Sequence, residues 1–283
     1  MKKLPFDELR GKVCVITGGA GIIGKALSEG LASMGVKMAV ADMAKDAADR
    51  AAAQIRKTHG VQAVGTECNV LDKDSLLKAK EFIHQELGVI DFLINCAGGN
   101  SPKATTQVEY LDKETTENLE KTFYGLDIEG FRNVFDLNFI GTILPTMVFT
   151  TGMIAKGGGV VLNISSMNSF RPLTKIPAYS AAKASVNNIT MWLAVHLAKA
   201  NIRVNAIAPG FFLTNQNRFL LIDEKTGHLT PRGNKILAAT PMGKFGEPEE
   251  LLGAVLFLLS DLSKFVTGVV VPIDGGFNAY SGV

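Results

Sequence analysis

Short, uninterrupted apolar runs recur along the chain and alternate with longer segments of helical periodicity. Continuous rather than alternating apolar residues are typical of strands that are covered on both faces. The runs that predict strands are 12–17, 36–42, 61–67, 89–95, 159–165, 202–208 and 267–274. Helical spacing is found at 22–34, 44–58, 72–87 and 248–260. Repeated β–α units predict an α/β fold with a doubly wound, mostly parallel seven-stranded sheet flanked by helices.

The domain organisation follows from what the pattern lacks. We find no linker, internal repeat or low-complexity tract in the 283 residues, and therefore expect one domain spanning 1–283. Two long polar stretches, 100–130 and 211–247, each follow the carboxyl end of a predicted strand. Because ligands bind at that edge of open α/β sheets, we expect both insertions to cover the substrate site. The alternative for each insertion is a surface loop that has no role in binding.

Charge and apolar segments exclude several classes of function. The 29 basic residues nearly balance 27 acidic ones, and no block of Lys and Arg exceeds two residues, which argues against a nucleic-acid partner. The uncharged run 137–155 contains Asn138, Pro145 and two glycines, so it predicts a buried helix rather than a membrane span. The first twelve residues lack the apolar core of a signal peptide. We therefore expect a cytoplasmic protein without a membrane partner.

Cysteine and histidine usage predicts no metal site. The three cysteines form no C-x-x-C, and the four histidines have no H-x-x-x-H spacing. Reduced, buried thiols fit a cytosolic protein.

The first strand is followed by a glycine motif that predicts a dinucleotide site. "GAGIIG" (19–24) satisfies G-x-G-x-x-G and lies between a predicted strand and an amphipathic helix, the context of a Rossmann-type fold. Glycines there allow the pyrophosphate to approach the backbone at a helix N-terminus. The second strand ends at Asp42, 18 residues beyond Gly24. Its carboxylate can accept hydrogen bonds from ribose hydroxyls and would repel a 2′-phosphate, so the predicted cofactor is NAD.

A pair of chemically active side chains lies further along. Tyr179 and Lys183 stand four residues apart in "YSAAK", on one face of a helix. Their context is an ordered series: "TGGAGIIG", Asp42, "NCAG" (95–98), "LNF" (137–139), "NISS" (163–166), "YSAAK" and "PGFFLT" (209–214). From about residue 12 to residue 276, the chain resembles the short-chain dehydrogenase/reductase family.

The resemblance implies the catalytic roles. Ser166, 13 residues before Tyr179, would hydrogen-bond the substrate oxygen that gains or loses a proton. Tyr179 would be the general acid or base, its pKa lowered by Lys183 and the positive nicotinamide of NAD⁺. Lys183 would also bind the nicotinamide ribose. Asn138 matches an asparagine at a helix kink that holds a water in a proton relay.

The resemblance also implies the cofactor contacts, with departures at two motifs. Cys96 replaces the second Asn of the usual "NNAG", and Ile22 stands where the family has glycine, the extra glycine being Gly21. Asn69 stands where Asp is commoner. The expected cofactor-binding residues are Gly18, Gly21, Ile22, Ile23, Asp42, Met43, Asn69, Val70, Asn95, Ala97, Gly98, Tyr179, Lys183, Pro209, Phe212 and Thr214.

Within the family, the insertions and the ending "DGGFNAYSGV" are similar to those of the D-mannonate oxidoreductase (fructuronate reductase) branch. This resemblance implies interconversion of D-fructuronate and D-mannonate. Such a substrate needs a cation for its carboxylate and polar groups for its hydroxyls. The candidates are Asn100, Asn168, Arg171 and Arg218, with Arg232, Asn215 and Gln216 as further possibilities.

Three alternatives stay open at this level. The chain could have gluconate 5-dehydrogenase-like activity, 3-oxoacyl reductase activity, or bind NAD(H) without turnover. The third would not need Ser166, Tyr179 and Lys183 together. The resemblance also implies a homo-oligomer, a tetramer or a dimer.

Overall fold

The structure, a computed structural model, describes residues 6–213, 221–223 and 226–282. It contains one sheet of seven strands in the order β3-β2-β1-β4-β5-β6-β7, with every pairing parallel. The strands are β1 (Val13–Thr17), β2 (Lys37–Asp42), β3 (Ala63–Glu67), β4 (Phe92–Asn95), β5 (Gly159–Ile164), β6 (Ile202–Pro209) and β7 (Val270–Ile273). The predicted α/β fold and all seven predicted strands are confirmed.

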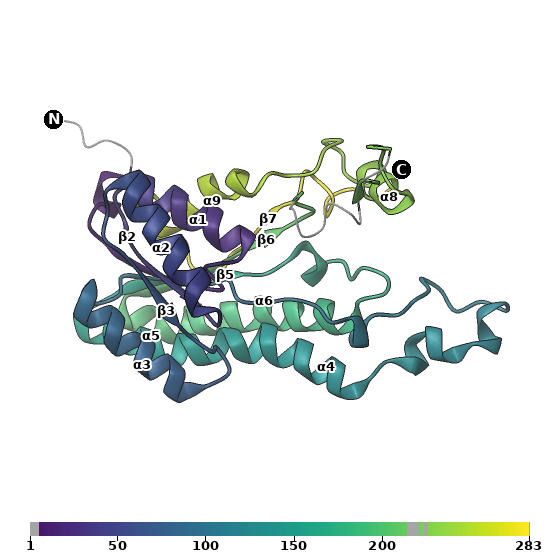
Figure 1. Cartoon of the computed structure of the whole chain (residues 1–283), viewed down its shortest axis with the longest axis horizontal. Coiled ribbons are helices and arrows are strands. Elements are labelled where there is room, and N and C mark those ends of the chain that lie inside the picture. The colour runs from purple at the N-terminus through teal and green to yellow at the C-terminus, as the bar shows by residue number, and fades with distance from the viewer. Residues whose placement is uncertain (1–5, 214–220, 224–225, 283) are drawn as a thin grey trace.

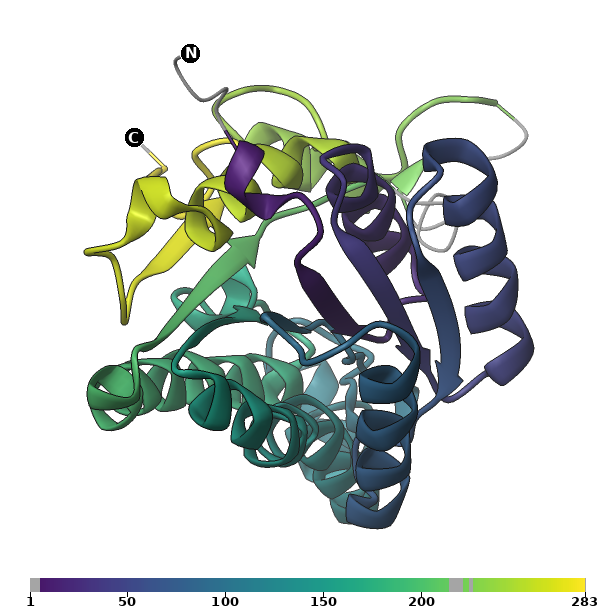
Figure 2. The ribbon, with the colours of Figure 1, turned by 90° about the vertical axis from the view of Figure 1, so that its left-hand side faces the viewer.

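The helices form two layers, one on each face of the sheet (Figures 1 and 2). One layer contains α1 (Ile22–Ser33), α2 (Lys45–His59) and α9 (Leu252–Leu259), and the other contains α3 (Lys73–Glu86), α5 (Gly141–Lys156) and α6 (Pro177–Leu197). Successive residues of β1 alternate between the two cores: Cys14 and Ile16 pack under the first layer, Val13 and Val15 under the second. This double coverage explains why the strands are apolar throughout.

The apolar run that suggested a buried helix lies within a continuous helical stretch, 128–156. It comprises α4 (Ile128–Phe135), one π-helical turn (Asp136–Ile140) and α5. Its length and composition would allow it to cross a membrane, but half of its most apolar window is buried inside the structure. Phe149 and Met153 of α5 are fully buried in the core beneath the sheet. The prediction of a core helix agrees with this packing.

The first insertion leaves the sheet after β4 and extends beyond the rest of the molecule before returning as α4 (Figure 1). It contains four short 3₁₀ turns, Pro102–Ala104, Thr115–Glu117, Leu119–Lys121 and Phe123–Gly125. The second insertion contains α8 (Pro231–Ala238). Both lie toward the same end of the molecule in Figure 1.

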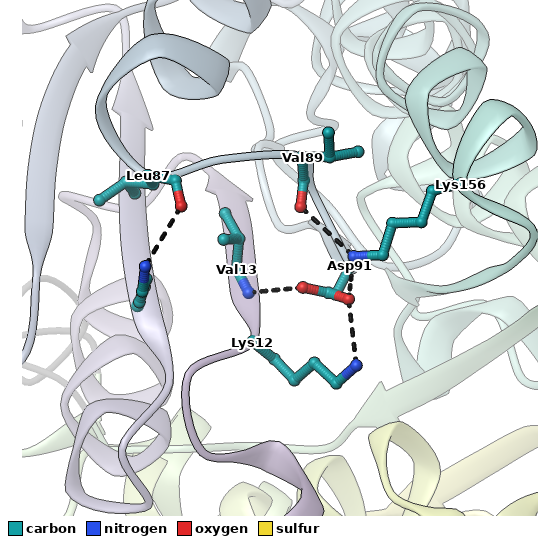
Figure 3. A network of polar contacts seen from close by, with 7 residues as sticks. Lys12, Val13, Leu87, Val89, Asp91 and Lys156 are labelled. Carbon is teal, nitrogen blue, oxygen red and sulfur yellow. Dashed lines mark hydrogen bonds and ion pairs between the residues drawn. The ribbon is translucent and has the colours of Figure 1, made fainter.

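At the amino ends of the strands, Asp91 joins three elements (Figure 3). Its carboxylate accepts a hydrogen bond of 2.8 Å from the backbone N–H of Val13 and forms ion pairs with Lys12 and Lys156. Asp91 is 7% exposed, so two cations and a backbone donor compensate its loss of hydration. These contacts stabilise the pairing of β1 with β4 at the amino ends of the two strands.

Candidate active site

A cleft of about 810 Å³ lies at the carboxyl ends of the strands. It lies between the neighbouring strands β1 and β4, from which the strand order runs outward in opposite directions. Ligands usually bind at this position in such folds. Most of the residues chosen from sequence line it: Gly18, Gly21, Ile22, Ile23, Asp42, Met43, Asn69, Val70, Ala97, Gly98, Ser166, Tyr179, Lys183, Pro209 and Phe212.

Glycines at the start of α1 allow backbone to pack directly on backbone. Gly18 has a φ of +62°, and a Cβ there would lie 2.8 Å from the Cα of Ala97. A Cβ on Gly24 would lie 2.4 Å from the carbonyl oxygen of Gly18. Gly21 is the N-cap and supplies no side chain, so the first N–H groups of α1 have no side-chain acceptor from it. This N-terminus therefore suits a phosphate group.

Asp42, the last residue of β2, is held in place by two backbone donors. One carboxylate oxygen accepts from the N–H of Ala20 at 3.0 Å, and the other accepts from the N–H of Ala44, also at 3.0 Å. Each oxygen keeps further acceptor capacity toward the cleft that it lines. A negative charge fixed at the end of β2 fits a ribose diol and disfavours a phosphate there.

Ser166, Tyr179 and Lys183 meet at the floor of the cleft, brought there by β5 and α6. The side chain of Ser166 hydrogen-bonds that of Tyr179, and its Oγ also accepts from the N–H of Asn168 at 3.2 Å. The Nζ of Lys183 donates to the carbonyl of Ile164 at 2.7 Å and lies 5.7 Å from the centre of the Tyr179 ring. The hydroxyls and the amine therefore share one small volume, and their catalytic roles stay a prediction.

The electrostatics of this group differ from the prediction. Burial raises the pKa of Tyr179, and the hydrogen bond from Ser166 only partly opposes that shift. Burial also lowers the pKa of Lys183 to about 8. The predicted lowering of the Tyr179 pKa by Lys183 is therefore wrong for the protein's own groups, because desolvation of the phenolate is the larger effect. The contribution of the nicotinamide charge stays a prediction.

Asn138 lies in the π-helical turn, where the sequence suggested a kink, and is fully buried. Its Nδ2 donates to the carbonyls of Gly99 and Val134, each at 2.7 Å, and its Oδ1 accepts from the N–H of Gly99 at 3.2 Å. A Cβ on Gly98 would meet both Asn138 Oδ1 (2.7 Å) and Lys183 Nζ (3.2 Å). Asn138 thus holds the edge of the cleft beside Lys183; its role in a water relay stays a prediction.

Asn95 is placed differently from the expectation. It lies beneath the cleft rather than in its lining, is 2% exposed, and donates from Nδ2 to Thr146 Oγ1 and Asn163 Oδ1, each at 2.9 Å. The strand pleat turns its side chain inward, so its neighbour Cys96 lines the cleft instead. Burial raises the pKa of the Cys96 thiol to about 12, which keeps it neutral.

The substrate candidates are the least well placed. Asn100 donates to Thr105 Oγ1 at 2.9 Å, and Arg171 Nε donates to the carbonyl of Asn278 at 2.8 Å; neither lines the cleft. Asn168 is buried beside Ser166, and Arg232 lies on α8. Thr214, Asn215, Gln216 and Arg218 lie outside the described residues.

Sequence reasoning missed several residues of the lining. They are Cys68, Leu71, Cys96, Gly99, Asn133, Leu137, Ile164, Ser165 and Phe211. The four-residue spacing of Asn133 and Leu137, just before Asn138, could have shown that one face of this helix borders the site.

Within the described ranges, no group of three or more His, Cys, Asp or Glu side chains could hold a metal ion.

Comparison with known proteins identifies the family. A family model described as enoyl-(acyl carrier protein) reductase matches residues 18–278. The chain belongs to the short-chain dehydrogenase/reductase family. It is therefore an oxidoreductase acting on a small molecule, and the resemblance found in the sequence is confirmed.

Three proteins are similar to this chain over nearly their whole length. A solved structure of a candidate D-mannonate oxidoreductase from Haemophilus influenzae, with bound NAD, has a TM-score of 0.91 and 48% identity, covering 98% of this chain and 99% of that one. An uncharacterized oxidoreductase of Bacillus subtilis, UxuB, is 47% identical over 99% of this chain and its own full length. A 2-dehydro-3-deoxy-D-gluconate 5-dehydrogenase of Formosa agariphila is 34% identical over 97% of this chain and 96% of its own.

Proposed function

We propose that this protein is an NAD-dependent oxidoreductase that interconverts a sugar-acid ketone and its alcohol, D-fructuronate and D-mannonate being the preferred pair. The observation that carries the reaction is the meeting of Ser166, Tyr179 and Lys183 at the floor of a dinucleotide-sized cleft. The substrate class is supported by the similarity to the candidate D-mannonate oxidoreductase and to a dehydrogenase of another sugar acid.

The residues of the cleft fit NAD. Gly18 and Gly24 leave no room for side chains at the start of α1, whose N-terminus suits the pyrophosphate. Asp42 is oriented to bind the adenosine ribose and to exclude a 2′-phosphate. When bound, NAD supplies the hydride acceptor, and NADH the donor.

The protein's own groups handle the proton. Ser166 Oγ hydrogen-bonds the substrate oxygen, which orients the carbonyl or alcohol and stabilises charge that develops on it. Tyr179 takes the alcohol proton in oxidation and returns it in reduction. Because burial raises its pKa, Tyr179 enters the cycle as a protonated phenol, suited to reduction of the ketone. Lys183 binds the nicotinamide ribose, and Asn138 holds the water through which the proton leaves.

The proposal also covers domain organisation, oligomeric state and localisation. We take the chain to be one domain whose segments 100–130 and 211–247 cover the substrate. Met191, Trp192 and Val195 of α6 are 49%, 54% and 81% exposed, an apolar strip that supports a homo-oligomer, a tetramer or dimer. We place the protein in the cytoplasm, since all three of its cysteines are free and two are buried.

We rank a 3-oxoacyl reductase and a binding protein without turnover below this function. The first would normally use NADPH, against which Asp42 acts, and the second has no need of a polarised Ser–Tyr–Lys group. A gluconate 5-dehydrogenase-like activity shares the substrate class and is tested alongside.

The test is a screen of aldonates and hexuronates for formation or consumption of NADH, with the Tyr179→Phe variant. The phenyl ring keeps the packing but removes the proton donor, so turnover should fall by roughly 10³-fold, within the range known for general acid–base groups. NADH binding, followed by fluorescence, should change less than about threefold.

The matched control is Tyr280→Phe, in which the same hydroxyl is removed from a tyrosine that is 39% exposed and lies outside both insertions. It should behave as wild type. Retained turnover in Tyr179→Phe would contradict the mechanism, and the absence of turnover with every sugar acid would contradict the substrate class.

A further inference from the structure

Charged side chains from three separate segments meet where the two insertions approach each other. Glu109, in the first insertion, forms an ion pair with Lys235 of α8, in the second. The hydrogen bond from Lys235, with smaller contributions from the charges of Lys175 and Arg232, holds the pKa of Glu109 below its usual range. We refer to Lys175, Arg232 and Lys235 as the rim cluster. The carboxylate of Glu109 is thus paired with Lys235 and also feels the charges of Lys175 and Arg232.

The segments that carry the rim cluster connect to elements that form the reaction centre. The N–H of Thr106 donates to the carbonyl of Lys175 at 2.8 Å, which joins the first insertion to the segment that precedes α6. Lys175 stands two residues before Pro177, where α6 begins, and Tyr179 lies in the first turn of that helix. The second insertion begins with Phe211 and Phe212, which line the cleft. All the segments that carry the cluster therefore start at the site.

The backbone at Lys175 is itself unusual. Its φ is +72°, one of three positive values among non-glycine residues in the described part of the chain. A side chain held in the left-handed region is strained, and such strain gathers at functional sites. The half-buried Lys175 keeps this conformation while its carbonyl bonds the first insertion.

The cluster has more positive charge than its one carboxylate neutralises. Within the described residues, neither Lys175 nor Arg232 forms an ion pair. Two other cations of the same segments are already engaged: Lys244 pairs with Glu250, and Arg171 bonds the carbonyl of Asn278. A guanidinium and two ammonium groups on segments that begin at the cleft are suited to bind a second carboxylate or to exchange the first.

We propose that Lys175, Arg232 and Lys235 form the subsite for the carboxylate of an acidic sugar substrate, and that Glu109 occupies this subsite until the substrate displaces it. The proposal rests on the proposed function and deepens it by assigning charge recognition to residues that, Arg232 apart, the sequence did not single out. Glu109 then keeps the two insertions together in the free enzyme, and an acid exchanges places with it, whereas a neutral polyol cannot.

The two partners of the ion pair provide the test, because a subsite and a simple structural link predict different signs. With D-mannonate as substrate, Lys235→Gln should raise KM about tenfold by removing a cation. Glu109→Gln should lower KM about threefold by removing the internal competitor. A structural link would instead make both variants shift KM in the same direction, since either one breaks the same pair. That outcome would overturn the proposal.

Two controls isolate the carboxylate. D-Mannitol, the neutral counterpart of D-mannonate, should show changes of less than twofold in KM, or in its inhibition constant against D-mannonate, in either variant. Lys264→Gln removes a comparable exposed ion pair, that with Asp261, from outside both insertions and should leave both constants unchanged. Equal effects on the acid and on the polyol would also overturn the proposal.

The subsite can be judged even where the proposed reaction fails. Lack of turnover with D-mannonate would contradict the proposed function alone. Calorimetric titration of the NADH complex with D-gluconate and with D-glucitol would then test the subsite. Tighter binding of the acid, lost in Lys235→Gln, supports it; equal or undetectable binding of both contradicts it.

Discussion

The cofactor side and the substrate side of the cleft are built in different ways. On the cofactor side, backbone packs on backbone at Gly18 and Gly24, and two N–H groups fix the carboxylate of Asp42. On the substrate side, 3₁₀ turns and the helix α8 bring exposed charges together, with Glu109 and Lys235 as the link between insertions. The first side is shaped by close backbone contacts, and the second by exposed charges that, in our proposal, exchange with a substrate carboxylate.

The largest effect is expected from adding one methyl group to the cofactor side, which tests how tightly its backbone segments pack. Gly24→Ala places a Cβ 2.4 Å from the carbonyl oxygen of Gly18 and 2.7 Å from the Cα of Gly19. Since both neighbours are backbone, we expect a loss of about 3 kcal/mol in the free energy of unfolding, at the upper end of overpacking effects. Urea unfolding of the cofactor-free protein measures it.

Gly253→Ala is the matched control, since Gly253 is also helical but a Cβ there meets nothing within 4 Å. It should stabilise the protein by about 0.5–1 kcal/mol, because alanine loses less chain entropy in a helix. A Gly24→Ala variant as stable as wild type would show that the two backbones can separate.

A pH series tests the burial of Lys183. Its pKa is lowered from 10.5 to about 8 in the folded chain, so between these values the unfolded state binds more protons. The free energy of unfolding should therefore rise with pH across this window, at most by about 1.4 kcal/mol per unit from this group. Lys183→Met should remove that rise, as seen in the difference between the two urea series from pH 7.5 to 9.5. If the free energies of unfolding of the wild type and of Lys183→Met changed with pH in the same way, the amine of Lys183 would be in contact with water.

A smaller change concerns cofactor choice. Asp42→Asn removes the charge but keeps an acceptor for Ala20 or Ala44. We expect the ratio of kcat/KM for NAD over that for NADP to fall about tenfold, equivalent to ~1.4 kcal/mol. Asp46→Asn, which removes an exposed charge from the first turn of α2, should leave the ratio unchanged. An unchanged ratio in Asp42→Asn would exclude this carboxylate as the selector.

The smallest effect is expected at Arg171. The sequence suggested Arg171 as a ligand for the carboxylate of an acidic sugar, but its Nε bonds the carbonyl of Asn278 and the side chain does not line the cleft. We now expect less than a twofold change in KM for D-mannonate, measured beside Lys235→Gln. A tenfold increase would restore Arg171 as a carboxylate ligand.

The sequence by itself determined the sheet and its seven strands, because these depend on local patterns: continuous apolar runs and a strand–glycine–helix junction. A four-residue helical spacing put Tyr179 and Lys183 on one helix face, whereas Ser166 and the catalytic roles came from the resemblance to the family. Only the tertiary structure placed Asn95 beneath the cleft and Cys96 in its wall, because a strand's pleat and its neighbours decide which side chain faces inward. It alone showed burial to be the dominant influence on the pKa of Tyr179. The meeting of Glu109 with Lys235, 126 residues apart, also required the fold. Charges on long insertions have no periodicity, and their partners are set by how separate loops approach in space.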